Sequence, residues 1–299
     1  MRTLLLMAVA VLAVSLSGPL MAAMVVPPLA IAFWRNGLAA VALAPVALAP
    51  VALGGRREEL RGLRGGQLRF ILLSGVTLAV HFAMWVTSLT LTSVASATAL
   101  VCLQLVWIVA WQLLRGERFG GLVSTGLVLA FGGVLVVSGV DFTLSVRALV
   151  GDMLALVGGI AAAAYTVLGS RARQSVTTTT YTFVCYGSCA LVLAVACLVS
   201  GQNLAGYPAP QWGLLLLVTG TAQLLGHSVL NHLLATTSPM AVSLALLLEV
   251  PGASILAAVI LGQQPPALAL LGLGVMLGGM ALVVVGNRGS ATLTEAPVD

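Results

Sequence analysis

Polar side chains set singly inside long apolar stretches are the residues of this chain best able to do chemistry. Glu249 lies near the middle of one such stretch, 239–261. An ionised carboxylate at that depth in a bilayer is costly unless it faces a polar cavity or takes up a proton. Glu249 therefore predicts a cavity-lining site for a proton or a substrate. The alternative is a protonated Glu249 that hydrogen-bonds a backbone carbonyl freed by Pro251.

Helical spacing links several more polar residues. Gln223, His227 and Asn231 recur every four residues, so they share one face of a helix that we expect to line a cavity rather than face lipid. An imidazole titrates near neutral pH, which suits His227 to proton coupling; a neutral histidine in an interhelical hydrogen bond is the alternative. His81 and Trp85, one turn apart, form a similar stripe.

Two other stretches add aromatic groups. Gln104 and Trp107 share a helix face and offer one amide beside an aromatic wall. The hydroxyl of Tyr165 needs a partner if it is buried, which a cavity would supply, and core packing is the alternative. The predicted substrate-binding residues are therefore His81, Trp85, Gln104, Trp107, Tyr165, Gln223, His227, Asn231 and Glu249.

Arg35 and the Ser17-Gly18-Pro19 segment are two further features of the apolar stretches. We place Arg35 in the outer third of its stretch, where it can snorkel to the lipid headgroups, so anchoring of the helix is the alternative to a substrate contact. Ser17-Gly18-Pro19 interrupts the first stretch, and such breaks leave backbone groups to be satisfied by water or ligand.

Transmembrane helices are the elements that must position these residues. The sequence is 60% hydrophobic and only 7% charged, which leaves too little polar surface for a soluble domain. Apolar stretches of roughly 20 residues recur, each long enough to cross a hydrocarbon core of about 30 Å. We predict an all-α integral membrane protein of ten transmembrane helices, at 4–24, 29–53, 69–88, 94–114, 121–140, 149–169, 180–200, 212–235, 239–261 and 267–286.

The arginines set the predicted orientation of these spans. The chain has no lysine, and with the N-terminus inside every arginine except Arg35 and Arg147 falls on the cytoplasmic side. This asymmetry predicts a bacterial-type inner-membrane protein with both termini in the cytoplasm. The four cysteines fall inside predicted spans and are interpreted as free packing thiols.

An internal repeat divides the chain. A shift of 146 positions aligns His81 with His227, Gly116 with Gly262 and Gly126 with Gly272, without a gap. We predict one five-helix repeat over 1–145, a second over 146–288, and a flexible cytoplasmic tail over 289–299. Because five is an odd number, the second repeat enters the membrane inverted, which suits alternating access.

Several motifs resemble those of the drug/metabolite transporter superfamily, in its EamA branch. Gly116-Glu117-Arg118 is similar to the end of that family's fourth helix, and Gly151-Asp152 with the following Leu154-Ala155-Leu156 is similar to the start of its sixth. Glu249 occupies the place of the glutamate in the family's Glu-Pro signature, although here the proline is Pro251, and Gln263 replaces a second helix-end glutamate. The resemblance implies a ten-helix metabolite carrier.

The function favoured by these observations is secondary transport. We expect an exporter of small metabolites or amino acids that works by alternating access and is driven by exchange with protons. It is expected to be a monomer or a weak homo-oligomer. A nucleotide-binding Walker loop is excluded because it needs a lysine. No enzymatic activity, metal, cofactor or nucleic-acid partner is expected; an intramembrane hydrolase and a channel or sensor on the same scaffold are the alternatives.

Overall fold

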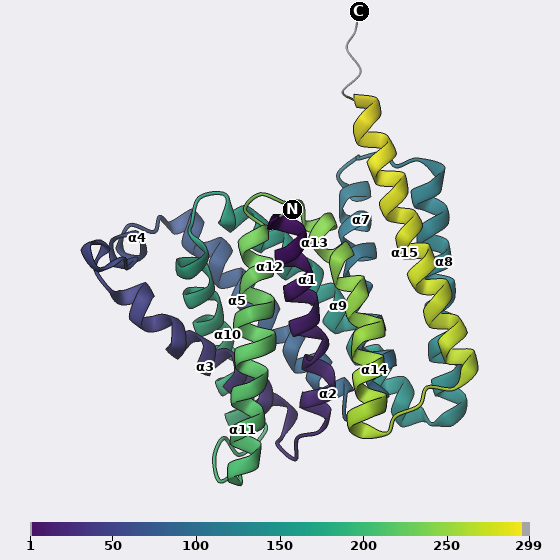
Figure 1. The fold of residues 1–299 in the computed structure, drawn as a ribbon, viewed down its shortest axis with the longest axis horizontal. Helices are drawn as coiled ribbons and strands as arrows, with labels where there is room; N and C mark the ends of the chain where they lie inside the picture. The colour runs from purple at the N-terminus through teal and green to yellow at the C-terminus, as the bar shows by residue number, and fades with distance from the viewer. Residues whose placement is uncertain (1, 295–299) are drawn as a thin grey trace, which may run out of the picture.

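The computed structural model describes residues 2–294, and within them every regular element is a helix (Figure 1). The first half comprises α1 (Arg2–Ser15), α2 (Ser17–Ala22), α3 (Pro28–Leu48), η1 (Val51–Leu53), α4 (Arg57–Arg61), α5 (Gly65–Ser88), α6 (Val94–Cys102), α7 (Gln104–Leu114) and α8 (Gly121–Leu144). The second half comprises α9 (Val146–Arg173), α10 (Thr178–Val199), α11 (Ala209–Val218), the π-helix η2 (Thr219–His227), α12 (Ser228–Leu233), α13 (Pro239–Ala245), η3 (Leu246–Leu248), α14 (Glu249–Leu261) and α15 (Ala267–Thr294).

Eight helical segments of the described chain are long and apolar enough to cross a membrane. They are Thr3–Ala22, Pro28–Leu48, Gly65–Ser88, Val94–Leu114, Val146–Arg173, Thr178–Val199, Ala209–Leu233 and Pro239–Leu261. Within α8 and α15 the apolar stretches found are shorter, Gly121–Gly133 and Ala267–Val283. The chain is thus a multi-pass membrane protein, and the ninth and tenth spans remain a prediction.

Three predicted boundaries differ from the helices observed. The span predicted over 29–53 ends at Leu48, because Pro50 has no N–H with which to continue the helix. The loop expected between 140 and 149 is almost absent, since only Ser145 separates α8 from α9. Of the tail predicted over 289–299, residues to Thr294 are helical and 295–299 lie outside the described residues.

The two halves pack through equivalent helix pairs. α8 packs on α15 and α3 packs on α10, so each of these pairs joins a helix to its counterpart 146 positions away. The contact of α5 with α9 has its equivalent in the contact of α1 with η2. Figure 1 shows α8 and α15 side by side at one edge of the bundle. The repeat found in the sequence is therefore also a repeat of packing.

Glycines make the α8–α15 contact possible. A Cβ atom added at Gly126 would lie 2.5 Å from the oxygen of Gly279, and one at Gly133 would lie 2.5 Å from the oxygen of Gly272. These two approaches are equivalent under the 146-residue shift. Gly274 and Gly278, in contrast, face open space in this chain. Only residues without a side chain permit so close a backbone approach.

Loops at both ends of the bundle hold the start of a helix from the other half. Glu59 in α4 accepts hydrogen bonds from the backbone N–H (2.7 Å) and hydroxyl (2.6 Å) of Thr177, just before α10. At the other end Gln202 accepts one from the N–H of Leu29, in the first turn of α3. Burial alone would raise the pKa of Glu59, but hydrogen bonds from Thr177 and Thr180 hold that pKa below its ordinary value of 4.5.

The glycine contact predicts unequal effects of alanine at two neighbouring positions. Gly279→Ala should destabilise the protein by ~1–3 kcal/mol, because its methyl group would collide with the backbone of α8. Gly278→Ala should leave stability unchanged, since nothing lies within 4 Å of that site. Thermal unfolding of the two purified variants in detergent checks this, and equal unfolding temperatures would contradict the packing described.

The Glu59 contact predicts that α4 is released when the carboxylate is removed. Glu59→Ala should speed tryptic cleavage of the 54–64 segment by about threefold to tenfold, the effect of losing a few partly exposed hydrogen bonds. Glu58→Ala, which loses only a contact to Val51 in the same segment, is the control. Because the pKa of Glu59 is depressed, its contribution is complete above 4.5 and disappears as the pH falls through the folded value. Equal cleavage of both variants would show that Glu59 does not hold α4.

Candidate functional site

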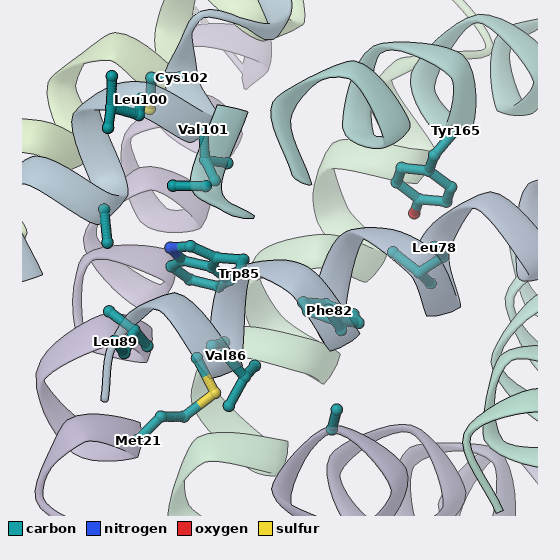
Figure 2. Close-up of a cluster of buried hydrophobic side chains, with 14 of the residues drawn as sticks. Met21, Leu78, Phe82, Trp85, Val86, Leu89, Leu100, Val101, Cys102 and Tyr165 are labelled. Carbon is teal, nitrogen blue, oxygen red and sulfur yellow. The ribbon is translucent and has the colours of Figure 1, made fainter. Parts of the chain in front are cut away.

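A cavity lies at the centre of the bundle, between helices of both halves. It is lined by His81, Trp85, Val101, Cys102, Gln104, Ala162, Tyr165, Thr166, His227, Leu230, Asn231, Leu234, Val242, Leu246 and Glu249. Figure 2 shows part of this region, with Phe82 and Trp85 along α5, Cys102 on one side and Tyr165 on the other. Seven of the nine predicted substrate-binding residues thus meet around one space.

The cavity is small in this conformation. Its volume is about 50 Å³, which is room for about four water molecules. A small metabolite would not fit without movement of the surrounding helices.

Polar groups without protein partners face this cavity. In the described part of the chain no hydrogen bond reaches the carboxylate of Glu249, the ring of His227 or the amide of Gln104. The indole Nε1 of Trp85 is buried and likewise unpaired. Buried polar groups are almost always satisfied by protein, water or ligand, so these four groups mark the place where water or a ligand belongs.

Other lining residues are held firmly by hydrogen bonds. Nδ1 of His81 donates to the oxygen of Gly158 over 3.0 Å, and the His81 ring stacks on Trp85 with centroids 5.6 Å apart. The hydroxyl of Tyr165 donates to Oδ1 of Asn231 over 2.8 Å, and Nδ2 of Asn231 donates to the hydroxyl of Tyr186 over 3.3 Å. These contacts fix one wall of the cavity while Glu249, His227 and Gln104 stay available.

Breaks in two spans place polar groups at the level of the cavity. The span Val94–Leu114 is interrupted at Leu103, directly before Gln104. The span Pro239–Leu261 passes through the 3₁₀ turn η3 directly before Glu249. Leu103 corresponds to Glu249 under the 146-residue shift, so the two interruptions lie within about one turn of equivalent positions in the two halves. The sequence predicted neither break.

Two predicted site residues lie elsewhere. Trp107 packs edge-on against Phe131, with centroids 5.9 Å apart, and lines an outer groove between α7 and α9. Gln223 points toward α3, because η2 is a π-helix whose wider turn rotates it away from the face of His227 and Asn231. The predicted common face of the three residues assumed ordinary α-helical geometry and is wrong for Gln223.

Arg35 belongs to a polar cluster that the sequence did not predict. It is completely buried, so the interpretation as a snorkelling anchor is wrong. Its Nε donates to Oε1 of Gln223 over 2.8 Å, its Nη1 donates to the hydroxyl of Ser17 over 3.0 Å, and its guanidinium lies 4.1 Å from the centroid of the Phe82 ring. Phe82 in turn meets His227 edge-on. The polar Ser17 and Gln223 were the available signal for this cluster.

A second hollow lies at the end of the bundle where α1 begins and α15 ends, which we call the basic end. Its volume is about 260 Å³, and it is lined by Ile108, Trp111, Gln112, Arg115, Glu117, Val167, Arg171, Ser238, Pro239 and Met240. Gln104 of the cavity lies one turn deeper on α7 than Ile108 of the hollow, and Thr166 of the cavity directly precedes Val167 of the hollow on α9. The two spaces thus follow one another along the same helices.

The repeated halves agree with a comparison to known protein families. Residues 1–139 and 149–285 each match the sequence pattern of the EamA-like transporter family. The chain belongs to this family. No curated protein sequence matches it. A solved crystal structure, titled only "Crystal structure of protein", is 17% identical with a TM-score of 0.66, over 96% of this chain and 98% of that one. At this identity the likeness shows a shared fold.

Metal binding has no ready site in this arrangement. Within residues 2–294, as far as they are described, no three His, Cys, Asp or Glu side chains lie close enough together to hold a metal ion. Cys102 lines the cavity, but its thiol donates to the oxygen of Leu246 over 3.5 Å. The groups that line the cavity can take part in hydrogen bonding, proton exchange and aromatic contact.

The Tyr165–Asn231 contact predicts a stability difference between two tyrosines. Tyr165→Phe should cost about 1 kcal/mol, because it leaves Oδ1 of Asn231 without its donor inside the bundle. Tyr207→Phe should cost nothing measurable, since that hydroxyl bonds Asn203 in an exposed loop. Thermal unfolding in detergent compares the two variants. An equal cost would mean that the Tyr165 hydroxyl does not fix the cavity wall.

Proposed function

We propose that this EamA family protein is a secondary carrier that exports small metabolites, such as amino acids, by alternating access. The observation that carries the proposal is the central cavity, where Glu249, His227, Gln104 and the Trp85 indole have no hydrogen-bond partner among the described residues. Groups of that kind suit a ligand with polar atoms and an aliphatic or aromatic body. Because the chain belongs to a transporter family, we interpret such a ligand as the transported substrate.

Two features of the repeated halves support alternating access. Equivalent helix pairs join the halves, and both halves break their fourth span beside the cavity. Broken helices at the centre of related repeats are typical of carriers whose halves rock about a fixed site. The arginines cluster at the basic end, so that end faces the cytoplasm of a bacterial-type inner membrane with both termini inside.

Proton coupling is assigned to Glu249, with His227 as its neighbour in the cavity. Both side chains lie in the lining of the cavity and neither is engaged by a hydrogen bond within the described residues. A carboxylate in that position can release its proton only into the water of the cavity. Protons would then be exchanged for substrate because the two occupy the central cavity in turn.

Two transport assays separate substrate binding from proton coupling at Glu249: substrate counterflow and uptake driven by a pH gradient. A thermal-stabilisation screen with the common amino acids first supplies a ligand, whose radiolabelled form is then used in proteoliposomes. Glu249→Gln should keep counterflow but lose uptake driven by an acid-inside pH gradient by about tenfold or more, because the amide cannot carry a proton. Glu58→Gln, a change in the exposed α4 segment, is the control.

Three results would contradict the proposal in different ways. Wild-type pH response in Glu249→Gln removes Glu249 from the coupling mechanism. Flux without counterflow in the wild-type protein indicates a channel. Chemical conversion of the bound ligand by the purified protein would indicate an enzyme.

A further inference from the structure

The end opposite the basic end is closed around the turn 89–93. The backbone N–H of Val94, which follows this turn, donates to Oε1 of Gln263 over 3.0 Å. The hydroxyl of Thr92 donates to Oδ1 of Asp152 over 3.0 Å. A Cβ atom added at Gly18 would lie 3.0 Å from Cγ1 of Val94, so α2 packs tightly on the start of α6. Elements of both halves therefore contact one another here.

The basic end contains the same elements in an open arrangement. The 146-residue shift places Glu117 at the position of Gln263, and Met240 at the position of Val94. Both residues line the hollow of about 260 Å³. The side chain of Glu117 is exposed, and the backbone N–H of Met240 makes no hydrogen bond to the described residues. The contact that closes one end is thus absent at the other, with its donor and acceptor both still present.

Glu117 is the residue able to reproduce that contact. Its carboxylate accepts hydrogen bonds as the Gln263 amide oxygen does, and it does so more strongly because it is charged. The counterpart of Asp152 is Leu6, whose aliphatic side chain cannot accept a hydrogen bond. Arg115 and Arg171 also line the hollow, so closing it would bring the Glu117 carboxylate toward two cations.

We propose that Glu117 closes the basic end by accepting a hydrogen bond from the N–H of Met240, in the conformation in which Gln263 has released Val94. Glu117 and Gln263 then act as alternating latches at equivalent positions of the two halves. The inference rests on the proposed carrier function and assigns it a positioning residue at the entrance, separate from the cavity that binds the ligand.

Cysteine labelling at the two equivalent sites tests the latches. Met240→Cys and Val94→Cys are made singly in a chain whose Cys102, Cys185, Cys189 and Cys197 are replaced by alanine. Each reporter is combined with Glu117→Ala or Gln263→Ala, reconstituted in vesicles, and treated with a soluble maleimide on both sides of the membrane. No substrate is needed, so the readout does not depend on knowing the cargo.

The expected signature is reciprocal. Glu117→Ala should speed labelling at Met240→Cys and slow it at Val94→Cys, and Gln263→Ala should do the opposite, each by about threefold to tenfold, the effect of one hydrogen bond on a two-state equilibrium. Glu117→Gln should restore the wild-type pattern, because Gln263 performs the same task with an amide. Glu58→Ala should change neither rate.

The outcomes separate this inference from the carrier proposal. Equal effects of Glu117→Ala and Glu58→Ala on the labelling rates would overturn the latch. Faster labelling of both reporters in either latch variant would also overturn it, because a purely structural role loosens both ends together. A reciprocal pattern in a protein that shows no counterflow would keep the latch and overturn the carrier function.

Discussion

Hydrocarbon offers no hydrogen-bond partner, and every polar atom of this bundle is placed accordingly. The backbone is satisfied within helices, and buried side chains pair with one another, as Arg35 does with Gln223 and Tyr165 does with Asn231. Exceptions among the described residues lie at several places, among them Nη2 of Arg35, the hydroxyl of Thr98 and the indole of Trp85. The central cavity differs from the other places because several such groups, including Glu249, His227 and Gln104, face one space.

Most of the architecture could be predicted because its signals are long-range and repeated. Apolar stretches predicted the spans, eight of which the described helices match, and the 146-residue repeat predicted two related halves that the family match shares. Helical spacing placed His81 with Trp85 and His227 with Asn231 on common faces, and the cavity brings these faces together. Polar residues at similar depth in neighbouring spans can hardly converge anywhere except along the central axis.

The failures have local causes that a pattern of spacing does not contain. Gln223 left its predicted face because η2 is π-helical, and nothing in Thr219–His227 marks a wider turn. Arg35 was placed by its distance along the span, which says nothing about the side of the helix from which it projects. The breaks at Leu103 and before Glu249 lack the glycine or proline immediately at the break that would have marked them, and they depend on tertiary packing.

The glycine contact between α8 and α15 has a consequence for biosynthesis. α8 emerges from the ribosome well before its partner α15, which follows 146 positions later in the chain. Until α15 arrives, lipid tails must fill the furrow left by Gly126 and Gly133. The pairing of α8 with α15 then releases those tails. A chain that stalls before α15 would leave this surface of α8 exposed, where quality-control proteases could recognise it.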